Sequence, residues 1–233
     1  MEARRPHLVS ARTLEVTFNA SGAADAAARG RVVVVVDVVD ASTSAEAALA
    51  AGAVAVFGAA PARVEVPVAV RPRAVGVRAA EEARRRETDV VVVAEPRVGS
   101  ENERFVRVRP ILEALEAEGV RYEVVPNQGA ELPSLAELGG RIVIMVSTTG
   151  GSAFDAALLA GAPAVTFATT ARVAGKPGWE ITEIGAVRAI GLADERDRDL
   201  SVVAASANSA DDCLAAFEVA RAIINQGFLQ LER

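Results

Sequence analysis

The chain has 233 residues, of which 51% are hydrophobic and 24% are charged, and its formal net charge is −6. A chain of this length and hydrophobicity can bury a large core, which excludes an intrinsically disordered protein. Its acidic balance and its content of only 4% aromatic residues argue against a nucleic-acid-binding protein, which needs basic and stacking surfaces.

Short apolar runs along the chain predict β-strands that are buried on both faces. Each run has four or five consecutive residues, rich in Val and Ile, without the alternation of a half-exposed strand. Charged residues, glycine or turn residues bound most of them. The predicted strands are residues 32–36, 54–57, 90–94, 142–146, 164–168 and 202–205.

Stretches rich in Ala, Leu, Glu and Arg separate these runs and have helical length. Pro110 and Gly119 predict the two ends of one helix, because proline suits a first turn and glycine the position after a last one. Strands that alternate with helices imply right-handed crossovers. We therefore predict an α/β fold with a mostly parallel, doubly wound sheet and helices on both faces. The predicted helices are residues 44–51, 77–87, 110–118, 153–160 and 209–226.

One segment of the chain is repeated. Residues 47–64 align without gaps with residues 156–173, and 12 of the 18 positions are identical. Each copy follows a predicted strand and a small polar turn. The sequence therefore predicts a single domain over residues 1–233 with an internal repeat, 31–64 and 141–173, that forms two related β-α-β lobes; convergence on similar local packing is the alternative.

A first candidate site follows the strand at 32–36. Asp37 and Asp40 supply carboxylates, and Ser42 and Thr43 supply hydroxyls. Oxygen ligands of this kind hold Mg²⁺, and the free N–H groups of a following helix bind phosphate. The alternative is that Asp40 or Ser42 only caps the helix.

A second candidate site is the turn STTGGS after the strand at 142–146. Its hydroxyls (Ser147, Thr148, Thr149) and its glycines form a cradle suited to an anion, since Gly151 and its neighbour allow close backbone approach. The segment does not have the spacing of a P-loop or of a dinucleotide-binding motif. The alternative is a well-capped connection without a ligand.

Two further groups follow predicted strands. Glu95 and Arg97 come after the strand at 90–94, and Arg97 is suited to bidentate binding of a phosphate or carboxylate. Asp211 and Asp212 come after the strand at 202–205. Adjacent side chains on a helix diverge, so we expect one of these two acids to face a shared metal ion. The alternative is that both acids only interact favourably with the helix dipole in the first turn.

These motifs together resemble the 2-phosphosulfolactate phosphatase family, over residues 31–226. The strand ending in Asp37 and the hydroxyls after it are similar to the family's first motif, AEPRVG to its Gly-Glu-Arg-x-Gly, and STTGGS to its Thr-Thr-Thr-Asn-Gly-Thr. The late acidic pair is also similar. The resemblance implies an α/β fold and a Mg²⁺-dependent phosphatase of coenzyme M biosynthesis.

The chain departs from the family pattern at several positions. Asp40 stands where the family usually has Arg, Gly150 replaces Asn, and Pro96 is inserted. The family's Asn-Ser-Pro element has no convincing counterpart. Replacing a phosphate-binding Arg by Asp reverses a charge, which at a dianion site costs on the order of several kcal/mol.

We therefore expect a Mg²⁺-dependent phosphatase that hydrolyses a small phosphoester such as 2-phosphosulfolactate. Asp37, with Asp211 or Asp212 and Glu95, is expected to hold Mg²⁺, and Asp37, Asp40 and Glu95 are the expected catalytic acids. Direct attack by water and an aspartyl-phosphate intermediate both remain open. The substrate-binding set is expected to be Ser42, Thr43, Arg97, Ser147, Thr148, Thr149 and Gly151.

Two other functions remain open. A haloacid-dehalogenase-type phosphatase has four motifs that Asp37, Ser147, Lys176 and the pair at 211–212 imitate in order. That class has acids two residues apart, whereas Asp37 and Asp40 are three apart. A catalytically degenerate binding or scaffold protein of the same fold is the second alternative.

The remaining features bear on location and partners. A single cysteine, Cys213, forms no internal disulfide, and the chain shows no signal peptide and no long apolar segment, so we expect a cytoplasmic protein with no membrane partner. His7 is interpreted as a surface residue. A small anionic phosphorylated substrate is the expected partner, nucleic acid is not, and a homo-oligomer is compatible with the composition.

Overall fold

A computed structural model describes residues 12–229 of the chain, so His7 lies outside the described residues. These residues form eight strands that alternate with seven α-helices and one 3-10 helix, η1 (Gly129–Ser134). The strands are β1 (Leu14–Phe18), β2 (Val32–Val36), β3 (Ala55–Ala59), β4 (Val90–Ala94), β5 (Tyr122–Pro126), β6 (Ile142–Val146), β7 (Val165–Phe167) and β8 (Leu200–Ala204). The helices are α1 (Asn19–Ala28), α2 (Ala41–Ala50), α3 (Pro72–Arg86), α4 (Glu101–Ala117), α5 (Gly150–Leu159), α6 (Gly178–Asp194) and α7 (Ala210–Asn225).

The strands form two four-stranded sheets in which every recorded pairing is parallel. The first sheet has the order β1-β8-β2-β7 and the second has the order β3-β6-β4-β5. β2, β4, β6 and β8 are buried along their whole length, as expected for continuous apolar runs in parallel sheets. The predicted α/β class with a doubly wound parallel sheet is confirmed.

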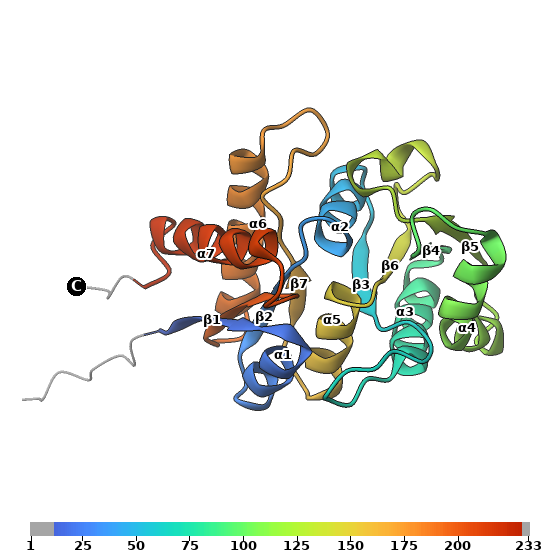
Figure 1. Ribbon diagram of the computed structural model, residues 1–233, viewed down its shortest axis with the longest axis horizontal. Coiled ribbons are helices and arrows are strands. Elements are labelled where there is room, and N and C mark those ends of the chain that lie inside the picture. The colour runs from blue at the N-terminus through green and yellow to red at the C-terminus, as the bar shows by residue number, and fades with distance from the viewer. Residues whose placement is uncertain (1–11, 230–233) are drawn as a thin grey trace, which may run out of the picture.

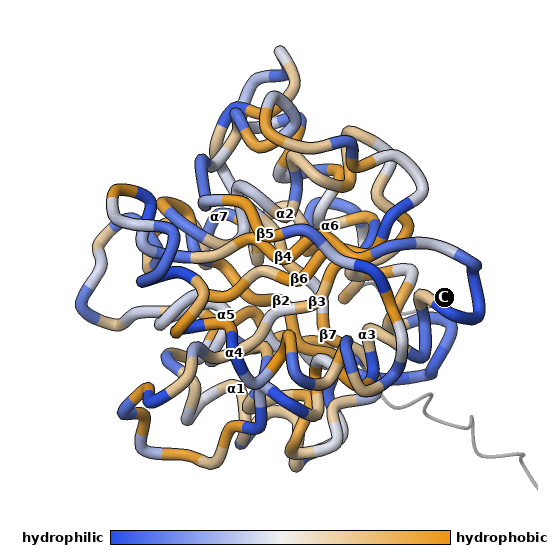
Figure 2. Tube along the Cα trace, turned by 90° about the vertical axis from the view of Figure 1, so that its right-hand side faces the viewer, coloured by the Kyte–Doolittle hydropathy of each residue, from blue (hydrophilic) through white to orange (hydrophobic). Residues whose placement is uncertain are grey.

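The sheets and helices form layers, visible in Figure 1. α6 and α7 pack on the outer face of the first sheet, and α3 and α4 pack on the outer face of the second. α1, α2 and α5 lie between the sheets, in a core that receives side chains from both, among them Val33, Val35, Val91 and Val143. Figure 2 shows the same distribution, with hydrophobic strands inside and hydrophilic segments at the periphery.

The two halves of the chain have equivalent topologies. Each strand of the first half has an equivalent in the second half: β1 and β5, β2 and β6, β3 and β7, and β4 and β8. If each strand is exchanged for its equivalent, the order of the first sheet becomes the order of the second, read from the opposite edge. The repeated segments are the equivalent units β2-α2-β3 and β6-α5-β7, and each crosses from one sheet to the other. The halves are thus interlocked, and their shared core holds the turns after β2 and β6 close together.

The main differences from the predicted elements are at α4 and at the sheet edges. α4 begins at Glu101, so Pro110 lies inside the helix and the predicted start is wrong. The Ser100 hydroxyl accepts the Glu103 N–H at 3.2 Å and the Glu103 carboxylate accepts the Ser100 N–H at 2.7 Å, which fixes the earlier start. Gly119, at φ +68°, follows the end of the helix as predicted. β1, β5, α1 and α6 were not predicted.

Within residues 12–229, none of the helices combines the length and the hydropathy that a bilayer-spanning segment needs.

Candidate functional site

The turns after β2 and β6 meet, although these strands belong to different sheets. Asp37 follows β2, and its Oδ2 atom accepts hydrogen bonds from the Thr149 hydroxyl at 2.9 Å and the Gly150 N–H at 2.7 Å; the Ser147 hydroxyl lies 3.5 Å away. All three donors belong to the turn that opens α5. The recorded hydrogen bonds of this carboxylate all go to Oδ2, which leaves Oδ1 for another partner.

Glycine is required where the two turns touch. A Cβ atom on Gly150 would lie 2.4 Å from Asp37 Oδ2, and one on Gly151 would lie 2.2 Å from the Ala59 carbonyl oxygen. Gly150 therefore has a local structural reason in this chain. Any side chain there would displace the Asp37 carboxylate.

Asp37 is 3% exposed and carries an unfavourable charge. Burial, followed by the nearby carboxylates of Asp212 and Asp40, raises its pKa to about 6, although the donors from Thr149 and Gly150 act in the opposite direction. A carboxylate held in this environment gains from any cation that approaches it.

Glu95, at the end of β4, is the second strongly perturbed acid. Burial is the main cause that raises its pKa to about 7, and Asp40 and Asp37 add to it by charge repulsion. Its Oε2 atom accepts the Thr148 N–H at 3.3 Å and lies 3.6 Å from Arg107 Nη2. Its Oε1 atom is buried and has no hydrogen-bond partner among the described residues.

Asp40 completes a group of three acids from two loops. It is the N-cap residue of α2, but its side chain makes no capping hydrogen bond, so the capping alternative does not apply to it. Burial raises its pKa, while Arg97, with Nη2 at 3.8 Å, lowers it. Asp40 in turn raises the pKa of both Asp37 and Glu95, which places all three charges within electrostatic reach of one another.

The two acids at the start of α7 lie in different environments. Asp212 is buried, accepts the Val38 N–H at 3.0 Å and raises the pKa of Asp37. Asp211 is exposed, and no hydrogen bond or ion pair of its side chain is recorded in the described part of the chain. Of the two predicted metal ligands, only Asp212 therefore borders the site, and its Oδ1 atom already holds the loop after β2.

The hydroxyls of α2 hold the turn after β2. Ser42 is fully buried; its Oγ atom accepts the Asp37 N–H at 3.0 Å and donates to the Asp37 carbonyl at 2.7 Å. The Thr43 hydroxyl donates to the Val38 carbonyl at 2.5 Å and lies 3.0 Å from the hydroxyl of Thr169. Both predicted substrate-binding hydroxyls are thus engaged in positioning Asp37.

Arg97 ties two loops together. Its Nε donates to the Asn127 carbonyl at 3.1 Å and its Nη2 to the Val39 carbonyl at 2.7 Å. The loop after β5 is further fixed by Asn127, whose side chain accepts the Gly129 N–H at 3.2 Å and a hydrogen bond from Ser44. Arg97 stands near the acids as predicted, but these bonds give it a positioning role.

Arg107, on α4, is a site residue that sequence reasoning missed. Its Nη2 donates to the Thr148 hydroxyl at 2.7 Å, and its Nε is buried without a partner among the described residues. The capping pattern Ser100-x-x-Glu103 could have indicated that α4 starts at residue 101, which places Arg107 in the second turn of the helix. The predicted start at Pro110 left Arg107 outside the helix.

Lys176, which the haloacid-dehalogenase alternative requires near Ser147, lies in the loop before α6. Its ammonium group forms an ion pair with Glu180, and the side chain is 47% exposed. No contact between Lys176 and the turn after β6 is recorded, so no observation favours that alternative.

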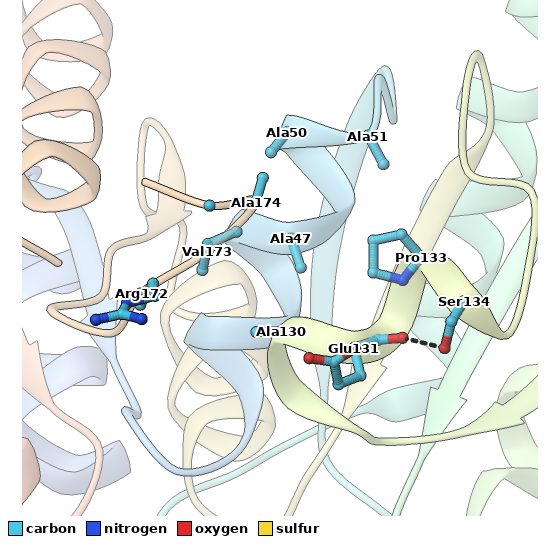
Figure 3. Close-up of a pocket in the computed structure, with 11 residues that line it drawn as sticks. Ala47, Ala50, Ala51, Ala130, Glu131, Pro133, Ser134, Arg172, Val173 and Ala174 are labelled. Carbon is cyan, nitrogen blue, oxygen red and sulfur yellow. Dashed lines mark hydrogen bonds between the residues drawn. The ribbon is translucent and has the colours of Figure 1, made fainter. Parts of the chain in front are cut away.

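A separate cavity of about 410 Å³ lies along the opposite end of α2 (Figure 3). Ala47 and Ala50 of α2 face Pro133 of the η1 segment across it, and the loop around Val173 closes one side. None of the acids described above lines this cavity. The solvent-accessible groups of the site lie instead at the rim formed by the turns after β2, β4 and β6. There, Thr148 and Arg97 are exposed, and Asp40, Glu95 and Arg107 are partly exposed.

Within the described residues, no group of three or more His, Cys, Asp or Glu side chains forms a ready-made metal site. Mg²⁺ is nonetheless commonly held by one or two carboxylates together with waters and substrate phosphates. The unpartnered Glu95 Oε1 atom and the mutual repulsion of Asp37, Asp40 and Glu95 fit such a cation.

No protein-family model matches the chain, and a search of curated proteins also returned no match. The resemblance to 2-phosphosulfolactate phosphatases therefore stays an expectation drawn from the motifs alone.

Proposed function

We propose that the chain is a Mg²⁺-dependent phosphatase that hydrolyses a small phosphoester at the rim formed by the turns after β2, β4 and β6. The observation that carries this proposal is the crowding of Asp37, Asp40 and Glu95, each with a raised pKa, beside hydroxyl and N–H donors. Unbalanced negative charge next to anion-binding groups is what a metal-assisted phosphoryl site requires before its cation and substrate bind.

The residues fit a cation that is shared with the substrate. Asp37, through its free Oδ1, and Glu95, through its free Oε1, are the proposed ligands, with Asp40 near them. Mg²⁺ bound there would neutralise phosphate charge and lower the pKa of a bound water. Asp212 is proposed to fix the loop that carries Asp37, because its carboxylate accepts the Val38 N–H.

Glu95 is proposed to act as a ligand of the cation. Its pKa of about 7 means that protons compete with a cation for its carboxylate at neutral pH. Its partly exposed position would let a cation held there also reach a substrate oxygen.

The direct test measures phosphate release from a panel of small phosphoesters, including 2-phosphosulfolactate, with Mg²⁺ and with EDTA. Hydrolysis by the wild type that requires Mg²⁺ and is lost in Asp37→Asn is the expected result. Asp25→Asn is the matched control, since Asp25 is an exposed aspartate of α1 that pairs with Arg29 outside the site.

Equal activity of the wild type and Asp37→Asn, or activity that persists in EDTA, would contradict the proposal. If neither protein releases phosphate but the wild type binds phosphate with Mg²⁺, the chain is a binding protein of this fold and the proposed hydrolysis is wrong. Both outcomes are read from the same protein samples.

A further inference from the structure

Arg107 and Glu95 form a pair with unused hydrogen-bonding capacity on both sides. The Nε of Arg107 and the Oε1 of Glu95 are buried, and neither has a partner among the described residues. The two side chains meet with Arg107 Nη2 3.6 Å from Glu95 Oε2, and buried polar atoms are almost always paired, so an unpaired atom on each side chain indicates that a ligand joins them. A ligand that carries both an anionic oxygen and a proton or a bound cation would satisfy the two atoms together.

The pair is joined to the Asp37 side of the site through one turn. The Thr148 hydroxyl accepts a hydrogen bond from Arg107 Nη2 at 2.7 Å, and the Thr148 N–H donates to Glu95 Oε2 at 3.3 Å. The next residue, Thr149, donates its hydroxyl to Asp37 at 2.9 Å. Consecutive residues of one turn therefore contact Arg107 on one side and Asp37 on the other, so a single small group at this turn can reach both.

Two other arginines at the turn after β4 are already occupied: Arg104 donates to the carbonyls of Pro96 at 3.3 Å and Gly99 at 3.0 Å. Arg97 donates to two backbone carbonyls, those of Asn127 and Val39. Within residues 12–229 the Arg107 side chain has one recorded hydrogen bond, and a guanidinium group has five N–H donors in a planar fork that matches the oxygens of a phosphoryl group. The side chain is 35% exposed, so a ligand can approach it from solvent.

From these contacts we propose that Arg107 binds the phosphoryl oxygens of a phosphomonoester dianion, with Thr148 beside it, and that Glu95 lies next to the same phosphoryl group. This assignment rests on the proposed function. It supplies a positive side chain for the dianion at a rim where Arg97 and Arg104 are already bonded to backbone carbonyls.

The test compares Arg107→Gln and Arg107→Lys with the wild type. The matched control is Arg109→Gln, on the same helix, where Arg109 is exposed and pairs with Glu113. Two quantities are measured: binding of inorganic phosphate by isothermal titration calorimetry with Mg²⁺, and the kcat and KM for hydrolysis of the best phosphoester. Thermal unfolding of each variant establishes that it is folded.

Arg107→Gln is expected to weaken phosphate binding and raise KM by roughly tenfold to a hundredfold, the range for losing a hydrogen bond to a charged group. Arg107→Lys is expected to recover part of this loss, and Arg109→Gln to behave as the wild type.

The outcomes separate this inference from the proposed function. If the wild type hydrolyses the ester but Arg107→Gln is folded and binds phosphate as tightly as Arg109→Gln, Arg107 is not the phosphoryl-binding residue and only this inference fails. If phosphate binding depends on Arg107 but no ester is hydrolysed, the binding assignment holds and the proposed hydrolysis fails. If the wild type does not bind phosphate, the binding assignment is wrong.

Discussion

Replacing Asp37 by Asn is expected to make the protein more stable while abolishing the proposed hydrolysis. The Asp37 carboxylate is 3% exposed, and its charge is opposed by burial and by Asp212 and Asp40. An asparagine oxygen can still accept the hydrogen bonds of Thr149 and Gly150, but it carries no charge. Asparagine therefore removes the unfavourable charge and keeps the contacts between the two turns.

The magnitude follows from the pKa of this group. Folding raises it from an ordinary value of 3.8 to about 6. The folded protein therefore binds the proton more tightly than the unfolded chain, so stability falls as the pH rises from about 4 to about 6 and stays low above that. The total is about 3 kcal/mol at pH 8, since one pKa unit corresponds to about 1.4 kcal/mol.

The assay is urea unfolding of the wild type, Asp37→Asn and the control Asp25→Asn at pH 4 and pH 8 without divalent cations. The stability advantage of Asp37→Asn is expected to be under about 1 kcal/mol at pH 4 and about 3 kcal/mol at pH 8. An advantage that does not grow with pH, or an Asp37→Asn protein less stable than the wild type at pH 8, would refute the reasoning. Asp25→Asn should show no such growth.

Three further predictions concern the same region. Gly150→Ala places a Cβ atom 2.4 Å from Asp37 Oδ2, so it is expected to displace the carboxylate and lower kcat/KM at least tenfold; wild-type kinetics in this variant would contradict the close contact. Mg²⁺ affinity, measured by calorimetry, should rise between pH 5 and pH 8 because protons on Asp37 and Glu95 compete with the metal, and a flat profile would exclude them as ligands. Ser100→Ala removes the cap of α4 and should lower the free energy of unfolding by about 1 kcal/mol, whereas an unchanged midpoint in denaturant would show that the cap is dispensable.

The central strands could be predicted from sequence because their burial leaves a direct signature. The runs at 32–36, 90–94 and 142–146 are continuous and rich in β-branched residues, and they match β2, β4 and β6 residue for residue. β1 and β5 were missed because they are edge strands. Their sequences, LEVTF and YEVVP, include acidic residues at partly exposed positions and lack a continuous apolar run.

Interlocking of the two halves could not be predicted from the repeat. The alignment of residues 47–64 with 156–173 indicates equivalent units, but strand pairing is set by contacts between residues far apart in the chain. β2 pairs with β7 and β8, and β3 pairs with β6. α6 contains Gly185, which is unfavourable inside a helix in isolation, and the side chain of Ala168 from a distant part of the chain packs closely against it.

The candidate site, like the fold, was predictable from the sequence only in part. Asp37, Glu95 and Ser147 directly follow buried strands, and ligands bind at the carboxyl ends of parallel strands, so sequence reasoning found them. β2 is in the first sheet and β4 and β6 are in the second, so their meeting depends on how the two sheets interlock. The roles of Ser42, Thr43 and Arg97 depend on which atoms their side chains meet in the folded chain. Those contacts leave no periodic signal in the sequence.

The most direct test of a cation shared by loops from different sheets is a crystal structure of the protein with Mn²⁺ and inorganic phosphate, measured where manganese scatters anomalously. An anomalous peak at coordination distance from the carboxylates of Asp37 and Glu95, with phosphate density reaching Arg107, is the predicted result. A peak elsewhere, or ordered carboxylates at this rim with no metal between them, would contradict it.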